Sequence, residues 1–174
     1  ILKMCLQIIR ENSDYESILI LSDSAKITLQ QETKDTVEEI EALADQVCDI
    51  KDIGAGPASG SFRTEGMLIV PCSMKTVAGI HSGYADNLIL RAADGTIKEQ
   101  RTLVLAARET PLSAIHLRNL SELATIPGIR IIPPMMTFYH QPENIEEMTY
   151  HIAAKLVEPF GIEEREYRRW TGLV

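Results

Sequence analysis

Short apolar segments that alternate with segments of helical spacing constrain the fold of this chain more than any other feature. The clearest apolar segment is residues 67–70, Met-Leu-Ile-Val, which lies between Gly66 and Pro71. A run of this length with Gly and Pro at its ends is typical of a strand buried on both faces of a parallel sheet. We predict further strands at 17–21, 102–106 and 129–132, and helices at 1–10, 24–33, 35–44, 74–82, 85–93, 113–124 and 145–160.

This alternation predicts an α/β fold in which one parallel sheet lies between two layers of helices, joined by right-handed crossovers. The chain has 174 residues, which suits one domain with a substantial core, so we expect residues 1–174 to form a single domain. In folds of this class, ligands bind at the carboxyl ends of the strands.

Composition excludes several classes of function. The net charge of −8 argues against a nucleic-acid-binding surface, because a phosphate backbone would be repelled on average. No apolar run approaches the length that crosses a bilayer, so we expect no membrane span. The three cysteines share no ligand spacing with one another or with the four histidines, so we expect neither disulfides nor a metal site and place the protein in the cytoplasm.

The junction after the 67–70 strand has the chemistry of an anion site. Ser73 is placed to cap a helix that starts at Met74, and this cap leaves free backbone N–H groups at the positive end of the helix dipole. The Lys75 ammonium and the Thr76 hydroxyl follow within one turn. An ordinary strand-to-helix turn with a surface lysine is the alternative interpretation of the same residues.

Two other predicted strands also end in polar residues. Ser22 follows the strand at 17–21, and Arg108, Glu109 and Thr110 follow the strand at 102–106. Because parallel strands end at one edge of a sheet, these three ends should form one shared site.

Several blocks occur in a characteristic order and spacing: S-G-S-F at 59–62, P-C-S-M-K-T at 71–76, R-A-A-D at 91–94, I-K-E at 97–99, R-E-T-P-L at 108–112, F-Y-x-x-P at 138–142 and R-W at 169–170. Together they resemble the flavin prenyltransferases, the UbiX-like proteins, over nearly the whole chain. The resemblance implies a flavodoxin-like (Rossmann-like) flavoprotein domain. It also implies an enzyme that joins the dimethylallyl group of dimethylallyl phosphate to N5 and C6 of reduced FMN.

The resemblance also implies partners and an assembly. The product, prenylated FMN, would serve a UbiD-type aromatic acid decarboxylase, and the protein would form a homododecamer with active sites at subunit boundaries. An FMN-binding subunit or carrier without turnover is the alternative function. Oxidative cysteine decarboxylases share the fold, but the loop P-P-M-M-T-F-Y-H at 133–140 lacks their asparagine-containing motif.

Site residues are carried over by position. The expected FMN contacts are Ser22, Ser73, Met74, Lys75, Thr76 and Arg108. The expected dimethylallyl phosphate contacts are Tyr139 and Lys155. The expected catalytic residues are Glu32, Arg91, Lys98 and Glu109. Without the resemblance, Arg91, Lys98 and Glu99 would be interpreted as solvated helix charges.

The sequence departs from the family pattern in two places. Family members begin with a strand and a Gly-rich turn that hold the flavin phosphate, and both precede the position of Ile1, so one strand of the sheet is expected to be missing from this sequence. Either the natural chain starts earlier or it lacks this strand. Many relatives carry Arg where this chain has Lys155, which keeps the charge but loses the planar fork that suits a phosphate.

Overall fold

Strand and helix alternate along the chain as the apolar pattern predicts. The computed structural model describes residues 1–164 and 166–172. Its elements are α1 (Leu2–Glu11), β1 (Ile18–Leu21), α2 (Asp23–Glu32), α3 (Val37–Glu41), β2 (Gln46–Asp49), η1 (Gly56–Ala58), β3 (Gly66–Cys72), α4 (Met74–Ser82), α5 (Leu88–Lys98), β4 (Thr102–Ala107), α6 (Ala114–Leu123), β5 (Ile129–Ile131), α7 (Ile145–Val157) and η2 (Glu158–Phe160).

The strands pair in parallel, but among the described residues they form two sheets rather than the single predicted one. β3, β4 and β5 form a three-stranded sheet with β4 in the centre, and β1 pairs with β2 in a second sheet. β2 was not predicted, because its residues Gln46 to Asp49 are mostly exposed and carry no apolar run that would mark a strand. β2 pairs with β1 through backbone hydrogen bonds, and the backbone donors and acceptors that form them do not depend on the residue type.

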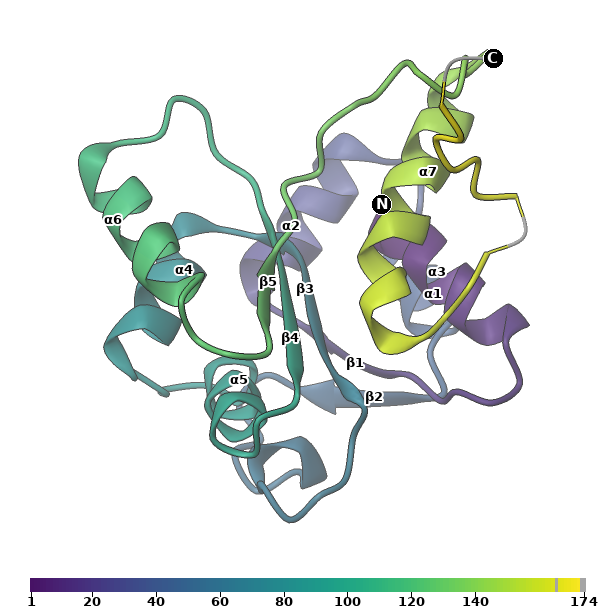
Figure 1. Ribbon diagram of the computed structural model, residues 1–174. Coiled ribbons are helices and arrows are strands. Elements are labelled where there is room, and N and C mark those ends of the chain that lie inside the picture. The colour runs from purple at the N-terminus through teal and green to yellow at the C-terminus, as the bar shows by residue number, and fades with distance from the viewer. Residues whose placement is uncertain (165, 173–174) are drawn as a thin grey trace.

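Helices cover both faces of the three-stranded sheet, which confirms the predicted three-layer α/β fold (Figure 1). Leu103 and Leu105 of β4 pack with residues of α4, α5 and α6. Val104 and Ala106 point to the opposite face and pack with α1 and α7. The alternation of side chains along one strand therefore divides the core into two halves, and all four of these side chains are fully buried.

Three predicted helices differ from the observed ones at their ends. The segment predicted at 35–44 is helical only over α3, because Thr36 forms a capping box with Glu39 and sets the start. The segment predicted at 85–93 starts later and runs on to Lys98, because the Asn87 side chain accepts a hydrogen bond from Leu90 N and caps α5. α7 stops at Val157, and η2 then leads to Gly161, whose φ of 84° suits glycine.

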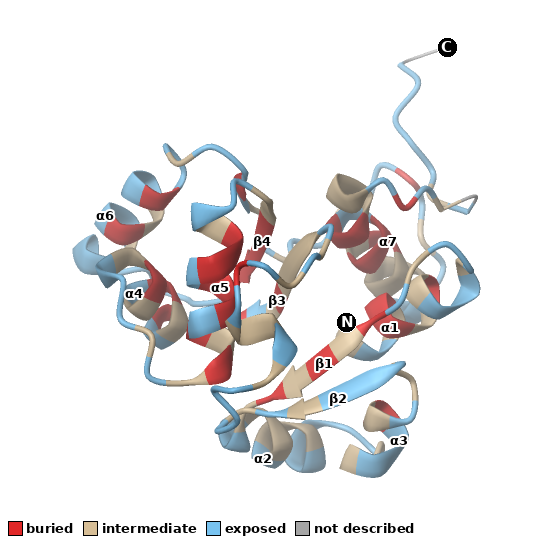
Figure 2. Cartoon of the chain, turned by 90° about the horizontal axis from the view of Figure 1, so that it is seen from below, coloured by how far each residue is buried: buried red, intermediate tan, exposed pale blue. Residues whose placement is uncertain are grey.

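Burial is uneven across the molecule. Figure 2 shows buried residues concentrated on β4, on α5 and on the inner face of α7. By contrast, α2 contains no buried residue. Within the described part of the chain, no helix is both long enough and apolar enough to span a lipid bilayer.

The central strand should dominate stability. Replacing the fully buried Leu105 with Ala should lower the free energy of unfolding by about 2–5 kcal/mol, because the substitution removes buried methyl groups and leaves a cavity. Leu117→Ala on α6 is the matched control, since Leu117 is 53% exposed and should cost below about 0.5 kcal/mol. Urea unfolding followed by circular dichroism measures both, and equal losses would contradict the assignment of β4 as the core strand.

Candidate functional site

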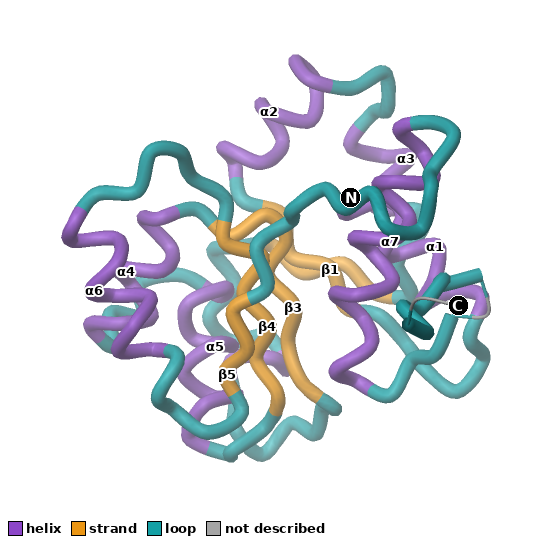
Figure 3. Tube along the Cα trace, turned by 45° about the horizontal axis from the view of Figure 1, so that its top comes forward, coloured by secondary structure: helices purple, strands orange, loops and turns teal. Residues whose placement is uncertain are grey.

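The carboxyl edge of the three-stranded sheet brings two of the predicted strand ends together. β3 and β4 finish side by side, with Cys72 opposite Ala107 after a register shift between Ile69 and Cys72, and the Arg108 backbone N–H donates to the Cys72 carbonyl at 3.1 Å. Ser73 and Arg108 therefore follow neighbouring strand ends. Figures 1 and 3 agree that α2, which follows β1 and is capped by Ser22, begins close to this edge.

Two serine-capped helix starts supply hydrogen-bond donors at this edge. Ser22 Oγ accepts a hydrogen bond from Ala25 N at 3.1 Å, and Ser73 Oγ accepts one from Thr76 N at 3.4 Å. In each helix, the backbone N–H groups of the residues between the capping serine and the capped N–H have no partner within the helix. Ser73, Lys75 and Arg108 are exposed.

This set of donors fits the phosphate of an FMN molecule, because it combines free N–H groups, a hydroxyl and two cations. Met74 belongs to the predicted set as well, but its side chain is buried in the core beside α5. A contact from Met74 would therefore come from its backbone N–H.

A cavity of about 190 Å³ lies beyond the carboxyl end of β5. Its walls come from the end of β5, from the loop that follows it, from α7 and from the C-terminal segment. The lining residues are Ile132, Pro133, Met135, Thr137, Tyr139, His151, Ile152, Lys155 and Tyr167. Both residues predicted to bind dimethylallyl phosphate, Tyr139 and Lys155, are among them.

A small ionic cluster surrounds Glu158 at one side of this cavity. Lys155 Nζ lies 2.5 Å from Glu158 Oε2, and the Arg169 guanidinium pairs with the other carboxylate oxygen. The hydrogen bond from Lys155 is the main cause that lowers the pKa of Glu158, with a further contribution from Arg169. Two cations therefore share one carboxylate, so the cluster carries a net positive charge beside the cavity.

Aromatic and imidazole rings form the other side. The Tyr139 hydroxyl lies 3.0 Å from His151 Nε2, and the His151 ring is stacked on His140 with 3.9 Å between the ring centroids. Tyr167 lies 4.5 Å from His151 between ring centroids. Burial raises the pKa of Tyr167 to about 12, and the neighbouring Tyr139 adds to the shift, so its phenol stays protonated near neutral pH.

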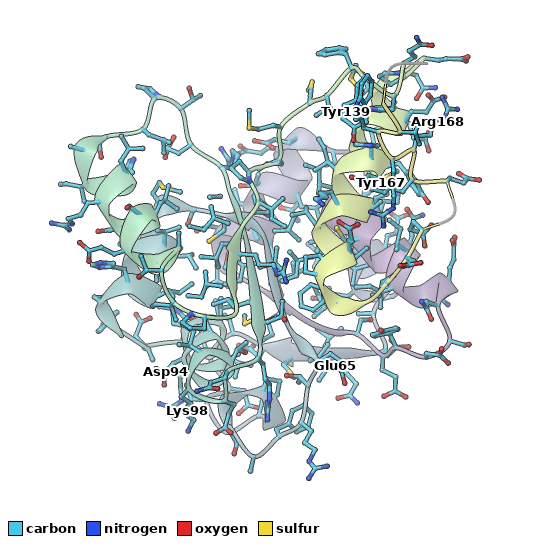
Figure 4. The ribbon with its side chains drawn as sticks, viewed as in Figure 1. Glu65, Asp94, Lys98, Tyr139, Tyr167 and Arg168 are labelled. Atoms are coloured by element: carbon cyan, nitrogen blue, oxygen red, sulfur yellow. The ribbon has the colours of Figure 1, made fainter. Side chains whose placement is uncertain are left out.

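Other predicted residues lie away from the cavity. Figure 4 shows Lys98 and Tyr139 on opposite sides of the molecule, and Arg91 is on the same helix as Lys98. Glu32 is the last residue of α2, about 15 Å along the helix axis from its start, and it is exposed. The Glu109 carboxylate is exposed and accepts a hydrogen bond from Thr110 N at 3.1 Å. Within one chain, the four predicted catalytic residues are not assembled around Tyr139.

Cys72 behaves as the sequence suggested, as a small packing residue. It is fully buried at the end of β3, and burial raises the pKa of its thiol to about 12. The thiol therefore stays protonated and is a poor nucleophile.

The sequence analysis did not identify His151 and Tyr167 as part of the cavity. One signal was available for His151. It precedes Lys155 by four residues, so both lie on one face of α7, and a role for Lys155 implies that His151 is its neighbour. Tyr167 carries no such signal, because a segment without regular structure brings it to the cavity.

Comparison with known proteins gives consistent similarities over nearly the whole chain. The family described as Flavoprotein matches residues 2–158. A protein of Streptomyces sp. (strain D7), named probable UbiX-like flavin prenyltransferase, is 47% identical over 168 residues, which are 97% of this chain and 84% of that protein.

Two solved structures are also similar. A dodecameric FMN-dependent UbiX-like decarboxylase from Escherichia coli O157:H7 has a TM-score of 0.94 and 45% identity, over 98% of this chain and 91% of that one. AnUbiX in complex with FMN and dimethylallyl pyrophosphate has a TM-score of 0.95 and 42% identity, over 99% of this chain and 90% of that one.

The ionic cluster makes a prediction about stability. Because the folded-state pKa of Glu158 is lowered, its stabilisation is complete above the ordinary value of 4.5 and is lost as the pH falls through the lowered value. Glu158→Gln should therefore reduce the free energy of unfolding at about pH 7, by less than about 1 kcal/mol because both cations are largely exposed. The difference from the parent should be smaller at about pH 3 than at about pH 7, because protonation of Glu158 weakens its pairing as the pH falls.

Urea unfolding at the two pH values measures this difference. Glu65→Gln, at an exposed position, is the matched control and should show no such pH dependence. A gap between Glu158→Gln and the parent that stays constant with pH would contradict the assignment.

Proposed function

The chain belongs to the flavoprotein family, among its UbiX-like flavin prenyltransferases, and on this premise we propose that it transfers a dimethylallyl group from dimethylallyl phosphate to reduced FMN. The observation that carries the proposal is the position of the cavity beside the donor-rich strand ends. β3, β4 and β5 are parallel neighbours, so the starts of α4 and of the Tyr139 loop follow strand ends at one edge of one sheet. A flavin held at the start of α4 would therefore lie close to a phosphate ester held at the Tyr139 loop. AnUbiX binds both kinds of molecule.

Each part of the edge has a role in this proposal. The Ser22 and Ser73 helix starts, with Lys75, Thr76 and Arg108, hold the FMN. Bound in reduced form, the flavin supplies the nucleophile of the transfer. The chain's own task is to align the donor with it and to exclude water, for which the apolar cavity walls at Ile132 and Ile152 are suited.

The cations beside the cavity act on the leaving group. Breaking the carbon–oxygen bond of dimethylallyl phosphate leaves negative charge on the phosphate, which Lys155 and Arg169 stabilise from fixed positions. Glu158 holds both cations in place through its two oxygens. Tyr139 contributes a hydroxyl donor from the opposite wall.

Arg91 and Lys98 enter through a neighbouring subunit in this proposal. They lie on α5, away from the cavity of their own chain, as Figure 4 shows for Lys98. The similar Escherichia coli O157:H7 protein is a dodecamer. A homododecamer of this chain would let α5 of one copy approach the cavity of another, and Glu32 and Glu109 would face the flavin and the donor phosphate there.

The wider setting follows from the reaction. Prenylated FMN would be passed to a UbiD-type decarboxylase that uses it as its cofactor. The three cysteines are free, which suits the reducing cytoplasm as the place of action. We expect residues 1–174 to act as one flavoprotein domain.

The reaction product is directly measurable. Incubation with reduced FMN and dimethylallyl phosphate without oxygen should add one dimethylallyl group to the flavin, which mass spectrometry of the extracted flavin detects. Tyr139→Phe should slow the transfer by about ten-fold or more, because it removes a hydrogen bond to a charged group. Tyr84→Phe, at an exposed position on the surface, is the matched control.

The alternative function, a flavin carrier, gives a different result. A carrier would bind FMN and leave its mass unchanged under every condition tested. That result with folded parent protein would overturn the proposed transfer.

Shared sites make a second prediction. Lys98→Ala and Tyr139→Phe subunits should each be slow alone, but mixed oligomers assembled from both should regain part of the parental rate. Recovery arises because some cavities then combine an intact Lys98 from one chain with an intact Tyr139 from another. Refolding the two variants together and separately, then assaying each, measures this recovery. No recovery in a mixed oligomer of confirmed composition would place both residues in one chain's site.

A further inference from the structure

Tyr139 and His151 approach the cavity from different elements and meet there. Tyr139 comes from the loop after β5 and His151 from α7, and the Tyr139 hydroxyl lies 3.0 Å from His151 Nε2. The His151 residue is 6% exposed, whereas Tyr139 is 42% exposed. A buried imidazole therefore contacts the polar tip of a more exposed side chain.

The ring of His140, which is stacked on His151, limits which ring nitrogens can carry a proton. His140 is also buried, and its Nε2 has no hydrogen-bond partner among the described residues. A proton on that atom would be an unpaired donor in a buried position, which is costly. The favoured neutral form of His140 therefore carries its proton on Nδ1, which lies 3.4 Å from Thr137 Oγ1.

Thr137 continues the chain of donors toward Tyr139. Its hydroxyl accepts from His140 Nδ1 and can donate to His151 Nδ1 at 3.5 Å, a long contact. With Nδ1 as an acceptor, neutral His151 carries its proton on Nε2, since a neutral imidazole has one donor and one acceptor. That N–H then points to the Tyr139 oxygen, with the Arg168 carbonyl as a second acceptor at 3.4 Å.

We propose that His151 is a positioning residue for the donor site: it donates a hydrogen bond to the Tyr139 oxygen and so leaves the Tyr139 hydroxyl proton free to point at a phosphate ester in the cavity. This inference rests on the proposed function, because it assigns the phosphate ester to this cavity. Thr137 and His140 act through His151 by fixing which of its nitrogens carries the proton. Tyr167, packed on His151 from the C-terminal segment, holds the ring in its plane.

The surroundings keep His151 in the neutral form that this arrangement needs. Burial is the main cause that lowers the pKa of His151, and the Lys155 ammonium lowers it further, while the hydrogen bond to the Arg168 carbonyl acts in the opposite direction. The groups that face it are His140 and Tyr139 from the loop, Lys155 from its own helix, and Tyr167 and Arg168 from the C-terminal segment.

A double-mutant cycle on donor binding tests the inference independently of turnover. Calorimetric titration of the FMN-loaded protein with dimethylallyl phosphate should show about ten- to hundred-fold weaker binding for Tyr139→Phe, which loses a hydrogen bond to a charged group. His151→Leu should lose nearly as much, and the double variant should lose no more than Tyr139→Phe alone. His151→Gln should recover most of the affinity, since its amide N–H can also donate to Tyr139.

His81→Gln is the matched control, because His81 lies on α4 and pairs with Glu122 on the surface. Thermal melting checks that each variant folds. Should His151→Leu unfold, Thr137→Val replaces it in the comparison, and binding should again weaken because the hydroxyl that orients His151 is lost.

The outcomes separate the two levels of the proposal. Parental affinity in His151→Leu or Thr137→Val, or additive losses in the double variant, overturns the positioning role while leaving the proposed function intact. A parent protein that binds FMN but not dimethylallyl phosphate overturns the proposed function, and the positioning role with it.

Discussion

The parallel pairing of β3, β4 and β5 is the constraint on which the rest of the structure depends. Because the last residues of β3 and β4, Cys72 and Ala107, pair with each other, the residues that follow them start from neighbouring points. The same ladder continues to Ile132, whose N–H donates to the Leu105 carbonyl before the chain enters the Tyr139 loop. Backbone hydrogen bonds, rather than side chains, therefore decide which loops share an edge.

For anion binding, the charge around the cavity matters more than the net charge of the chain. The chain carries a net charge of −8, yet Lys155 lines its cavity and shares Glu158 with a second cation, Arg169. Fixed cations next to apolar walls interact with an anion more strongly than the same cations in water. An acidic protein can thus hold a phosphate ester at one position without attracting anions over its whole surface.

Much of this architecture could be predicted from local patterns. The strand at 67–70 and the helix at 74–82 were found because Gly66 and Pro71 flank an apolar run and Ser73 caps the helix. The observed β3 is longer than predicted, because it includes both Gly66 and Pro71 and ends at Cys72. β2 was missed because exposed side chains leave no apolar signal, and the shift in α5 was missed because Asn87 was not recognised as its cap. In both cases a backbone or capping interaction, rather than hydrophobic spacing, determines where the strand or helix lies.

Some residues of the candidate site could likewise be found from the sequence, and others only from the tertiary structure. Motif positions alone led to Tyr139 and Lys155, and to the donors at Ser22, Ser73 and Arg108, because each stands next to a recognisable strand end or block. Only the tertiary structure brought His140, His151 and Tyr167 around Tyr139, and only it placed Lys98 on the opposite side of the molecule. The sequence by itself determined the layers, most strand ends and the residue types near them, since these follow from local spacing. Contacts between a loop, a helix and the C-terminal segment were decided by packing, because they join residues that no local pattern connects.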